Sequence, residues 1–551
     1  MTDQQLSSVK KFILYATAIA GATAGLLHWA AVGRPVEIAA APGDRLPCVS
    51  YAPYHRPGQS PLVKGTIVSR SQIDADLAQI ARSFRCVRTY SVDQGLAEVP
   101  ALARKHGLRV LLGLWIGPEA QENEREIVQG LAVLKRDADV INAVIVGNEV
   151  LLRRDQPASA LDGYLRRVRA ATSVAVTYAD VWEFWLRNPE IAAATTFVTV
   201  HILPYWEDNP IAADRAVDHV LNVYARVRDA FPGKHILIGE TGWPSAGRQR
   251  DGALPSLVNQ ADFIRNFVRV GQQLALDYNF VEAYDQPWKR KLEGTVGGYW
   301  GYFDAQGVEK YPRIGPVAEN AQWQRGWIAA GIAAGVFVLL ATTSIGAAGL
   351  LLMILSGAAC GAALWQGALD LSQWARNSLE AIVGGGYVVA AAFSSFFLAR
   401  ALAAWTDGIK PAGVPASFGG LLHWFMTNES NFNGRERALG FLRFVLLFCM
   451  AAVCLLLLAD PRYRDFPVPV FIVPAFGYAL LAIVGERRAD LTPGPEERAV
   501  AALIAITAAG IALQEGWHNA QAMRWCAVCL MFAASVIGPW LSARGRSNLP
   551  A

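Results

Sequence analysis

Two short apolar segments of the sequence each end in a carboxylate where a β-strand would end. They are VIVGNE at 144–149 and ILIGE at 236–240. A carboxylate placed directly after apolar β-formers is costly to bury unless it has a task. The glycine near each carboxylate allows another group to approach the backbone closely. Each Glu alone can equally be a salt-bridged strand terminus, but two at one end of one sheet are the minimum equipment for breaking a glycosidic bond.

Two carboxyl groups cleave such a bond by taking different roles. One is protonated and assists departure of the leaving oxygen, while the other is ionised and attacks the anomeric carbon. In the retaining reaction the first group then acts as a base and activates the acceptor, and the two carboxyls lie about 5–5.5 Å apart. Water as acceptor gives hydrolysis and a second glycan gives transglycosylation. The residue types do not separate these two outcomes.

The strands and helices that must position these carboxylates are predicted to form a (β/α)8 barrel. Apolar runs alternate with helical stretches such as 72–84, 121–136, 158–171, 212–230 and 257–274. Eight strands alternating with helices match this fold in number and size. The rival is an open doubly wound sheet, but no Gly-rich phosphate loop follows any strand. The predicted strands are 48–51, 86–90, 110–115, 140–146, 174–178, 197–202, 236–238 and 280–284.

In such a barrel the active site lies at the C-terminal ends of the strands, and aromatic or acidic residues stand at all eight ends. Aromatic faces cover the apolar faces of sugar rings, and polar groups bind the hydroxyls. Any single Tyr or Trp can instead be packing. The candidate substrate-binding residues are Tyr51, Tyr90, Trp115, Asn148, Tyr178, Tyr205, Trp243, Glu282, Asp285, Trp288 and Lys289.

Over residues 46–313 the sequence resembles glycoside hydrolase family 17, the β-1,3-glucanases and related glucanosyltransferases. The strongest motifs are VIVGNEV (144–150), ILIGETGWPS (236–245) and FVEAYDQPWK (280–289), and weaker ones are SYAPYHRPG (50–58) and VRTYSVD (87–93). The resemblance implies a retaining (β/α)8 glycosidase. It also implies that Glu149, after the fourth strand, is the general acid/base and that Glu240, on the seventh, is the nucleophile.

By the same resemblance, Asn148 hydrogen-bonds the 2-hydroxyl of the sugar and Tyr205 orients Glu240. The remaining polar floor is then supplied by Glu282, Asp285 and Lys289. The sequence departs from the family at HILPY (201–205), where the usual sixth-strand pattern contains Asn, and at 298–301, where a more polar segment is usual.

Cofactors and nucleic acid are not expected. No His-x-x-x-His or cysteine cluster has metal-ligand spacing, so no metal or organic cofactor is predicted. The net charge of +4 is small, and the basic residues stand at the ends of apolar runs, which suits membrane topology better than nucleic-acid binding. Cys48 and Cys86 begin adjacent predicted strands, so they can form a disulfide if this domain is exported.

The composition, 53% hydrophobic and 17% charged, is too apolar for an ordinary soluble protein. Residues 12–32 form an apolar run long enough to span a bilayer. Lys10 and Lys11 precede it and place the N-terminus in the cytoplasm and the next domain outside. A cleaved signal peptide is the alternative, because Ala39-Ala40-Ala41 offers a cleavage site, but the length of the run favours an uncleaved anchor.

After Pro312 apolar runs dominate the chain and predict seven further spans. We therefore expect three parts: a cytoplasmic N-terminus and first span (1–41), the barrel (42–320) and a membrane domain of about seven helices (321–551). The predicted spans are 327–343, 345–365, 381–404, 438–458, 468–484, 500–514 and 523–541.

These patterns predict a multi-pass protein of the cytoplasmic membrane whose exported barrel acts on β-1,3-glucan. Remodelling by elongation, branching or cyclisation is favoured, beside a separate glucan synthase or exporter as partner. One alternative is an endo-β-1,3-glucanase that only hydrolyses. The other is a glucan-binding or transport protein with an inactive barrel. Few ionisable residues within the spans disfavour a transport path, and the presence of both Glu residues disfavours lost catalysis.

Overall fold

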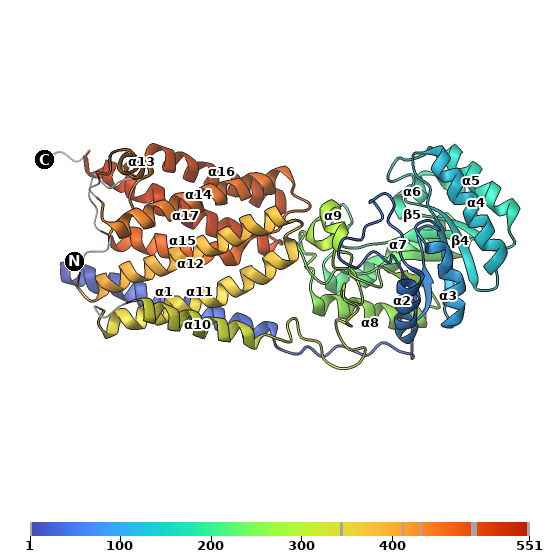
Figure 1. The fold of residues 1–551 in the computed structure, drawn as a ribbon, viewed down its shortest axis with the longest axis horizontal. Helices are drawn as coiled ribbons and strands as arrows, with labels where there is room; N and C mark the ends of the chain where they lie inside the picture. The colour runs from blue at the N-terminus through green and yellow to red at the C-terminus, as the bar shows by residue number, and fades with distance from the viewer. Residues whose placement is uncertain (1–2, 342–344, 410–412, 430–431, 486–492, 548–551) are drawn as a thin grey trace. The chain divides into compact units, whose positions relative to one another are not determined.

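The computed structural model describes residues 3–341, 345–409, 413–429, 432–485 and 493–547. The chain divides into two compact units. One is Val36–Val317, which contains every β-strand named below, and the other combines the segments before Val36 and after Val317 (Figure 1).

The unit Val36–Val317 is a closed barrel of eight parallel strands, and this confirms the predicted fold class. The strands follow one another around the barrel in chain order, and β8 closes it against β1. Parallel strands need a crossover between neighbours, which the helices between them provide. The strands are β1 (Leu46–Ser50), β2 (Phe84–Arg88), β3 (Arg109–Leu114), β4 (Ile141–Asn148), β5 (Ala175–Val181), β6 (Val198–His201), β7 (Ile236–Thr241) and β8 (Asp277–Phe280).

Strand β8 lies earlier in the chain than the predicted run 280–284. Its polar residue Asn279 is accommodated because the side chain donates hydrogen bonds to Ser50 Oγ at 2.8 Å and to the Gly239 carbonyl at 2.9 Å. Cys48 pairs with Asn279 and Val49 with Phe280, so the strand ends there. Glu282 and Asp285 consequently lie in the segment after the strand rather than at its last residue.

The helices around the barrel follow the predicted stretches closely. Helix α4 carries Ile127, Val133 and Leu134 on its buried face, while charged residues cover the other side. Ser69 and Ser256 cap α2 and α8 by accepting backbone N–H groups of Gln72 and Asn259. The α-helices are α2 (Arg70–Ser83), α3 (Val99–Lys105), α4 (Ala120–Asp137), α5 (Ala158–Ala171), α6 (Trp182–Arg187), α7 (Ala213–Ala230), α8 (Leu257–Gln273) and α9 (Arg290–Gly297), with short 3-10 turns at Leu96–Glu98, Pro189–Ala194 and Pro287–Lys289.

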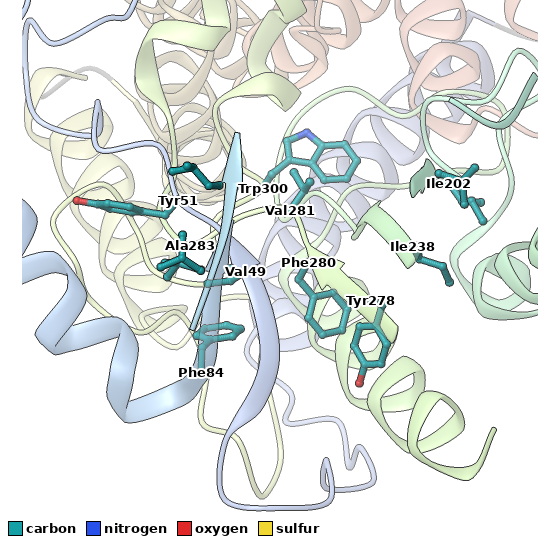
Figure 2. Packing of buried hydrophobic residues seen from close by; sticks show 14 of the residues in the cluster. Val49, Tyr51, Phe84, Ile202, Ile238, Tyr278, Phe280, Val281, Ala283 and Trp300 are labelled. Carbon is teal, nitrogen blue, oxygen red and sulfur yellow. The ribbon is translucent and has the colours of Figure 1, made fainter. Parts of the chain in front are cut away.

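Alternation along the strands separates an apolar layer from the barrel interior. Val49, Phe280 and Ile238 belong to the large buried cluster that the helices cover, part of which Figure 2 shows. Cys86, two residues before Arg88, belongs to a second, smaller cluster. Residues two apart in a strand point to the same side, so the Arg88 side chain, like that of Cys86, faces the barrel interior at the C-terminal end of β2.

The second unit is helical. Its helices are α1 (Asp3–Val32), α10 (Gln324–Leu340), α11 (Ala347–Trp374), α12 (Ser378–Thr406), α13 (Phe418–Thr427), α14 (Gly434–Ala459), α15 (Val468–Val484), α16 (Pro495–Glu515) and α17 (Ala520–Ser547). Within the described residues, five are long and apolar enough to cross a membrane, namely α1, α11, α12, α14 and α17. Helices α10 and α15 are apolar but shorter. These helices are therefore compatible with membrane association.

All eight predicted spans coincide with a helix, although only five meet the length and composition needed to cross a bilayer. The predicted end at Thr343 lies outside the described residues. Helix α16 covers the predicted span 500–514 but opens with Glu496, Glu497 and Arg498. The short helix α13 was not anticipated from the sequence.

Cys48 and Cys86 are joined by a disulfide, and they face each other across the β1–β2 pair. Serine at both positions is expected to lower the free energy of unfolding of the barrel by about 2–4 kcal/mol, because the bond restricts the unfolded chain between residues 38 apart. Pulse proteolysis of the full-length protein in urea measures this as a lower midpoint for barrel cleavage. Cys449→Ser, at a free thiol of the helical unit, is the matched control. Equal midpoints for the double variant and the wild type would contradict the expectation.

Candidate active site

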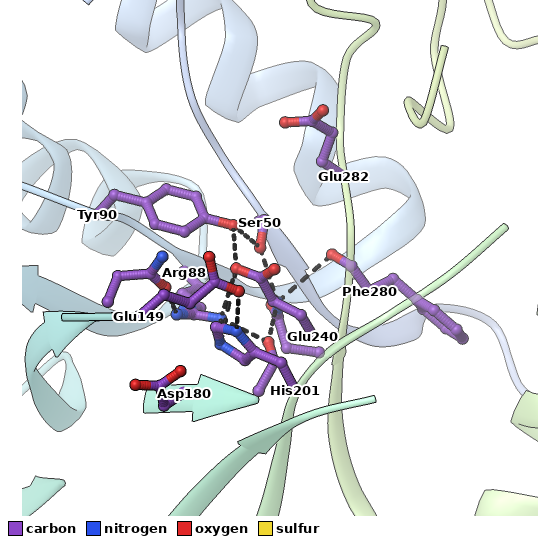
Figure 3. A network of polar contacts seen from close by, with 12 residues as sticks. Ser50, Arg88, Tyr90, Glu149, Asp180, His201, Glu240, Phe280 and Glu282 are labelled. Carbon is purple, nitrogen blue, oxygen red and sulfur yellow. Dashed lines mark hydrogen bonds and ion pairs between the residues drawn. The ribbon is translucent and has the colours of Figure 1, made fainter. Parts of the chain in front are cut away.

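The two predicted catalytic carboxylates lie together at the C-terminal ends of the strands (Figure 3). Glu149 directly follows β4, and Glu240 is the fifth residue of β7. One carboxylate oxygen of each lies within 4.8 Å of the other. Retaining glycosidases hold their carboxyls about 5–5.5 Å apart, whereas inverting enzymes need about 6.5–9.5 Å. The arrangement therefore suits double displacement.

Backbone geometry at Gly147 and Glu149 turns the end of β4. Both residues have positive φ, +85° and +52°. A side chain at Gly147 would be strained, and a Cβ there would lie 2.7 Å from Val150 Cγ2. Glu149 is held in its uncommon conformation by its N–H, which donates to the Ala179 carbonyl at 2.7 Å. The acid/base candidate thus stands on a turn that is fixed to β5.

Thr199 fills the space beside Gly239, where a Cβ would clash with its Cγ2, and the guanidinium of Arg88 binds the glycine's carbonyl. Its Nη1 donates to the Gly239 carbonyl at 2.7 Å and to Glu240 Oε1 at 3.1 Å, while Nη2 donates to Asn148 Oδ1 at 2.6 Å. The Arg88 side chain is 1% exposed. A cation buried this deeply needs anionic and carbonyl partners. Arg88 therefore links the ends of β4 and β7 and orients both the nucleophile candidate and Asn148.

Tyr90 supplies the other hydrogen bond to Glu240. Its hydroxyl donates to Glu240 Oε1 at 2.7 Å and lies 2.9 Å from Ser50 Oγ. Burial alone would raise the pKa of Glu240, but its cationic and polar neighbours, among them the Arg88 guanidinium and the Tyr90 hydroxyl, outweigh it and hold this pKa below its usual value. Glu240 is therefore kept ionised, as a nucleophile must be.

His201, the last residue of β6, lies between the two carboxylates. Its Nδ1 is 2.9 Å from Glu149 Oε1, and its Nε2 is 3.7 Å from Glu240 Oε1. Glu149, His201 and Glu240 together offer ligand atoms within 4.8 Å of one another, a grouping that can in principle hold a metal ion. The imidazole, however, turns different nitrogens to the two carboxylates, and the Arg88 cation already contacts Glu240. This geometry suits a hydrogen-bonded Glu149–His201 pair better than a metal centre.

Four of the predicted aromatic residues are fully buried and support the site rather than line it. Tyr51 donates to Asp76 Oδ2 at 2.9 Å, the Tyr178 hydroxyl bonds Asp180, and Trp243 Nε1 donates to the Leu254 carbonyl at 3.1 Å. Tyr205 was expected to orient Glu240, but its hydroxyl donates to the Arg248 carbonyl at 2.8 Å. It is Tyr90, on the segment after β2, that donates to Glu240.

Two buried ion pairs follow β8. Lys289 Nζ lies 2.8 Å from Glu282 Oε1, and Lys310 Nζ lies 2.6 Å from Asp285 Oδ1. Burial raises the pKa of Glu282 to about 7 and that of Asp285 to about 6. Lys289 also acts on Glu240 and lowers its pKa. The predicted polar residues of this segment therefore pair with lysines, and Lys310 is a partner that the sequence motifs did not indicate.

Trp115 is exposed, and Trp288 is half-buried, as Tyr90 is. Trp115 is 40% exposed, and the Arg153 guanidinium lies over its ring at 4.1 Å. Trp288 is half-buried, and its Nε1 donates to Gln286 Oε1 at 2.7 Å. Both can offer a ring face to a sugar.

Sequence reasoning did not assign a role to Arg88, His201, Ser50, Asn279 or Lys310. The sequence did contain a signal for Arg88 and His201, because each is a titratable residue among apolar and β-branched neighbours of a strand. A charge at such a position needs a buried partner. The family resemblance instead assigned the orienting of Glu240 to Tyr205.

Residues 48–301 match the family model of the BtgE/BtgC glycoside hydrolase domain. A probable β-glucosidase btgE of Aspergillus fumigatus is 25% identical over 264 residues, which are 46% of this chain and 45% of that protein. A glucan 1,3-β-glucosidase of Arthroderma benhamiae is 26% identical over 266 residues, 45% of this chain and 85% of that protein. In its alignments with the btgE proteins the chain spans about half of their length.

Among solved structures, the family 17 β-1,3-glucanosyltransferase of Rhizomucor miehei is 24% identical with a TM-score of 0.43. The alignment covers 50% of this chain and 97% of that one.

Replacing Arg88 with Met tests the electrostatic role of the guanidinium. Without this cation the pKa of Glu240 rises, so the nucleophile becomes protonated at a higher pH than in the wild type. The acid limb of the kcat/KM profile therefore moves to higher pH. We also expect kcat/KM at the optimum to fall about 100-fold or more, because donors preorganised at a reacting carboxylate contribute this much. The measurement is the pH profile of kcat/KM on a β-1,3-gluco-oligosaccharide. Arg85→Met, at an exposed site of the same strand, should leave the profile in place; a common profile for both variants would refute the role.

Proposed function

We propose that this protein, whose residues 48–301 are a glycoside hydrolase domain of the BtgE/BtgC type, is a membrane-anchored retaining enzyme that acts on β-1,3-glucan. The observation that carries the proposal is the close approach of the Glu149 and Glu240 carboxylates, within 4.8 Å, with Glu240 clamped by Arg88 and Tyr90. Substrate class is supported by the relatives, which include a glucan 1,3-β-glucosidase.

In the first half-reaction Glu240 attacks the anomeric carbon and the bond from this carbon to the leaving oxygen breaks. Glu149 gives its proton to that oxygen, so a free glucan hydroxyl departs and a glycosyl ester remains on Glu240. In the second half-reaction Glu149 takes the proton of the acceptor hydroxyl, whose oxygen attacks the same carbon and releases the Glu240 carboxylate. We infer that Asn148 binds the 2-hydroxyl of the sugar, and its bond to Arg88 supports this role.

We further propose that the acceptor is a second glucan, so that the enzyme remodels the polymer outside the cytoplasmic membrane. The Cys48–Cys86 disulfide supports an oxidising compartment for the barrel. The apolar helix α1, with Lys10 and Lys11 near its start, supports a cytoplasmic N-terminus. An enzyme fixed to the membrane is well placed to receive nascent polymer from a separate glucan synthase or exporter, whereas a degrading enzyme gains less from this.

The products of the full-length protein on β-1,3-gluco-oligosaccharides distinguish the candidate activities. We expect mass spectrometry to detect oligosaccharides longer than the substrate, because the glycosyl ester on Glu240 is resolved by a sugar hydroxyl. Glu240→Gln should abolish all products, since the amide cannot form the ester. Only shorter products would replace remodelling with hydrolysis. Identical mixtures from the wild type and Glu240→Gln would refute the catalytic assignment and favour a glucan-binding protein.

Protease protection in sealed membrane vesicles of known orientation tests the proposed side of the barrel. We expect cleavage within residues 36–317 only in right-side-out vesicles, because the leading lysines keep the N-terminus inside. A tag placed before Lys10 should show the reverse accessibility and serves as the internal control. Protection of the barrel in right-side-out vesicles would overturn the topology.

A further inference from the structure

Within the described residues, His201 is the ring that contacts both Glu149 and Arg88, the cation that is bonded to Glu240. The His201 side chain is fully buried. Nδ1 lies 2.9 Å from Glu149 Oε1, and Nε2 lies 3.2 Å from Arg88 Nη1. Each ring nitrogen therefore has a partner on a different strand, β4 for the first and β2 for the second (Figure 3).

The partner of Nε2 determines which tautomer the ring adopts. A guanidinium nitrogen can only donate a hydrogen bond, so Nε2 must accept and carries no proton. The proton of the neutral ring is then on Nδ1 and is donated to Glu149 Oε1. Arg88 Nη1 also donates to the Gly239 carbonyl at 2.7 Å and to Glu240 Oε1 at 3.1 Å, so its two hydrogens are shared among three acceptors. The Nη2 bond to Asn148 at 2.6 Å keeps the guanidinium from turning away to accommodate the other tautomer.

We propose that His201 is a positioning residue that reserves one oxygen of Glu149 for the catalytic proton. Because Nδ1–H occupies Oε1 in both half-reactions, the proton that Glu149 gives to the leaving oxygen and takes from the acceptor is carried on Oε2. Arg88 fixes this tautomer of His201 and also hydrogen-bonds Glu240. One guanidinium therefore orients both the nucleophile and the acid/base. This inference deepens the proposed function and rests on it.

The charged groups around His201 agree with this tautomer. They are Arg88 on β2, Glu149 after β4, Asp180 on β5 and Glu240 on β7. An N–H on Nε2 would face the Arg88 guanidinium, donor against donor, whereas an N–H on Nδ1 faces the Glu149 carboxylate.

Substitution of His201 by Asn tests positioning, because the Asn amide can donate to Glu149 as Nδ1–H does. We expect kcat/KM of His201→Asn within about tenfold of the wild type at the optimum. His201→Ala should lose about 100-fold in kcat with little change in KM, since Glu149 is no longer oriented. His219→Asn, on α7 beside Glu207, is the matched control. Equal losses of kcat in His201→Asn and His201→Ala would overturn the inference.

A readout independent of turnover separates failure of this inference from failure of the proposed function. Nitrogen NMR of the full-length protein with 15N-labelled histidine identifies His201 as the signal missing from His201→Asn. We expect one protonated and one unprotonated ring nitrogen at neutral pH, and loss of that pattern in Arg88→Met. A wild type inactive on every β-glucan would refute the proposed function, whereas a doubly protonated ring or the Nε2–H tautomer at neutral pH would refute the role of His201.

Discussion

A single buried cation, the guanidinium of Arg88, is the constraint on which the site depends. It lies inside the barrel at the end of β2, and its terminal nitrogens are bonded by groups at the ends of β4 and β7, together with the ring on β6. Burying such a charge is strongly unfavourable unless these partners stay in place. The barrel must therefore close with its register intact for Arg88 to be compensated. The same closure brings Glu149 and Glu240 within reach of each other.

The fold was predictable because its signal is repeated along the chain. Eight alternations of apolar and amphipathic segments leave few architectures, and the glutamates after β4 and on β7 were placed correctly at the strand ends. Strand β8 was placed too late because it contains Asp277 and Asn279, and the contacts of Asn279 with Ser50 and Gly239 explain how the barrel accommodates that amide. The family 17 resemblance is confirmed for the barrel by the BtgE/BtgC match.

The details of the site were less accessible, and for a physical reason. A sequence shows which residues end a strand but not how side chains from different strands pair across the barrel. Tyr90 and Tyr205 were equivalent candidates by residue type. The Tyr90 hydroxyl donates to Glu240, whereas the Tyr205 hydroxyl donates to the backbone carbonyl of Arg248 in the loop after β7. Likewise, His201 was recognisable in the sequence as a departure from the family pattern. Its position between two carboxylates depends on the register of β6 against β7, which the sequence does not show.

The stacking of Arg153 on Trp115 limits how a ring could be bound there. Arg153 Nη2 also donates to the Ile116 carbonyl at 2.9 Å, and its Nε donates to Asp155, so the guanidinium is held against one face of the indole. A sugar ring could then stack on the opposite face alone. Trp115 would thus contact a bound glycan from one side, and any second plane enclosing that ring would have to come from another residue.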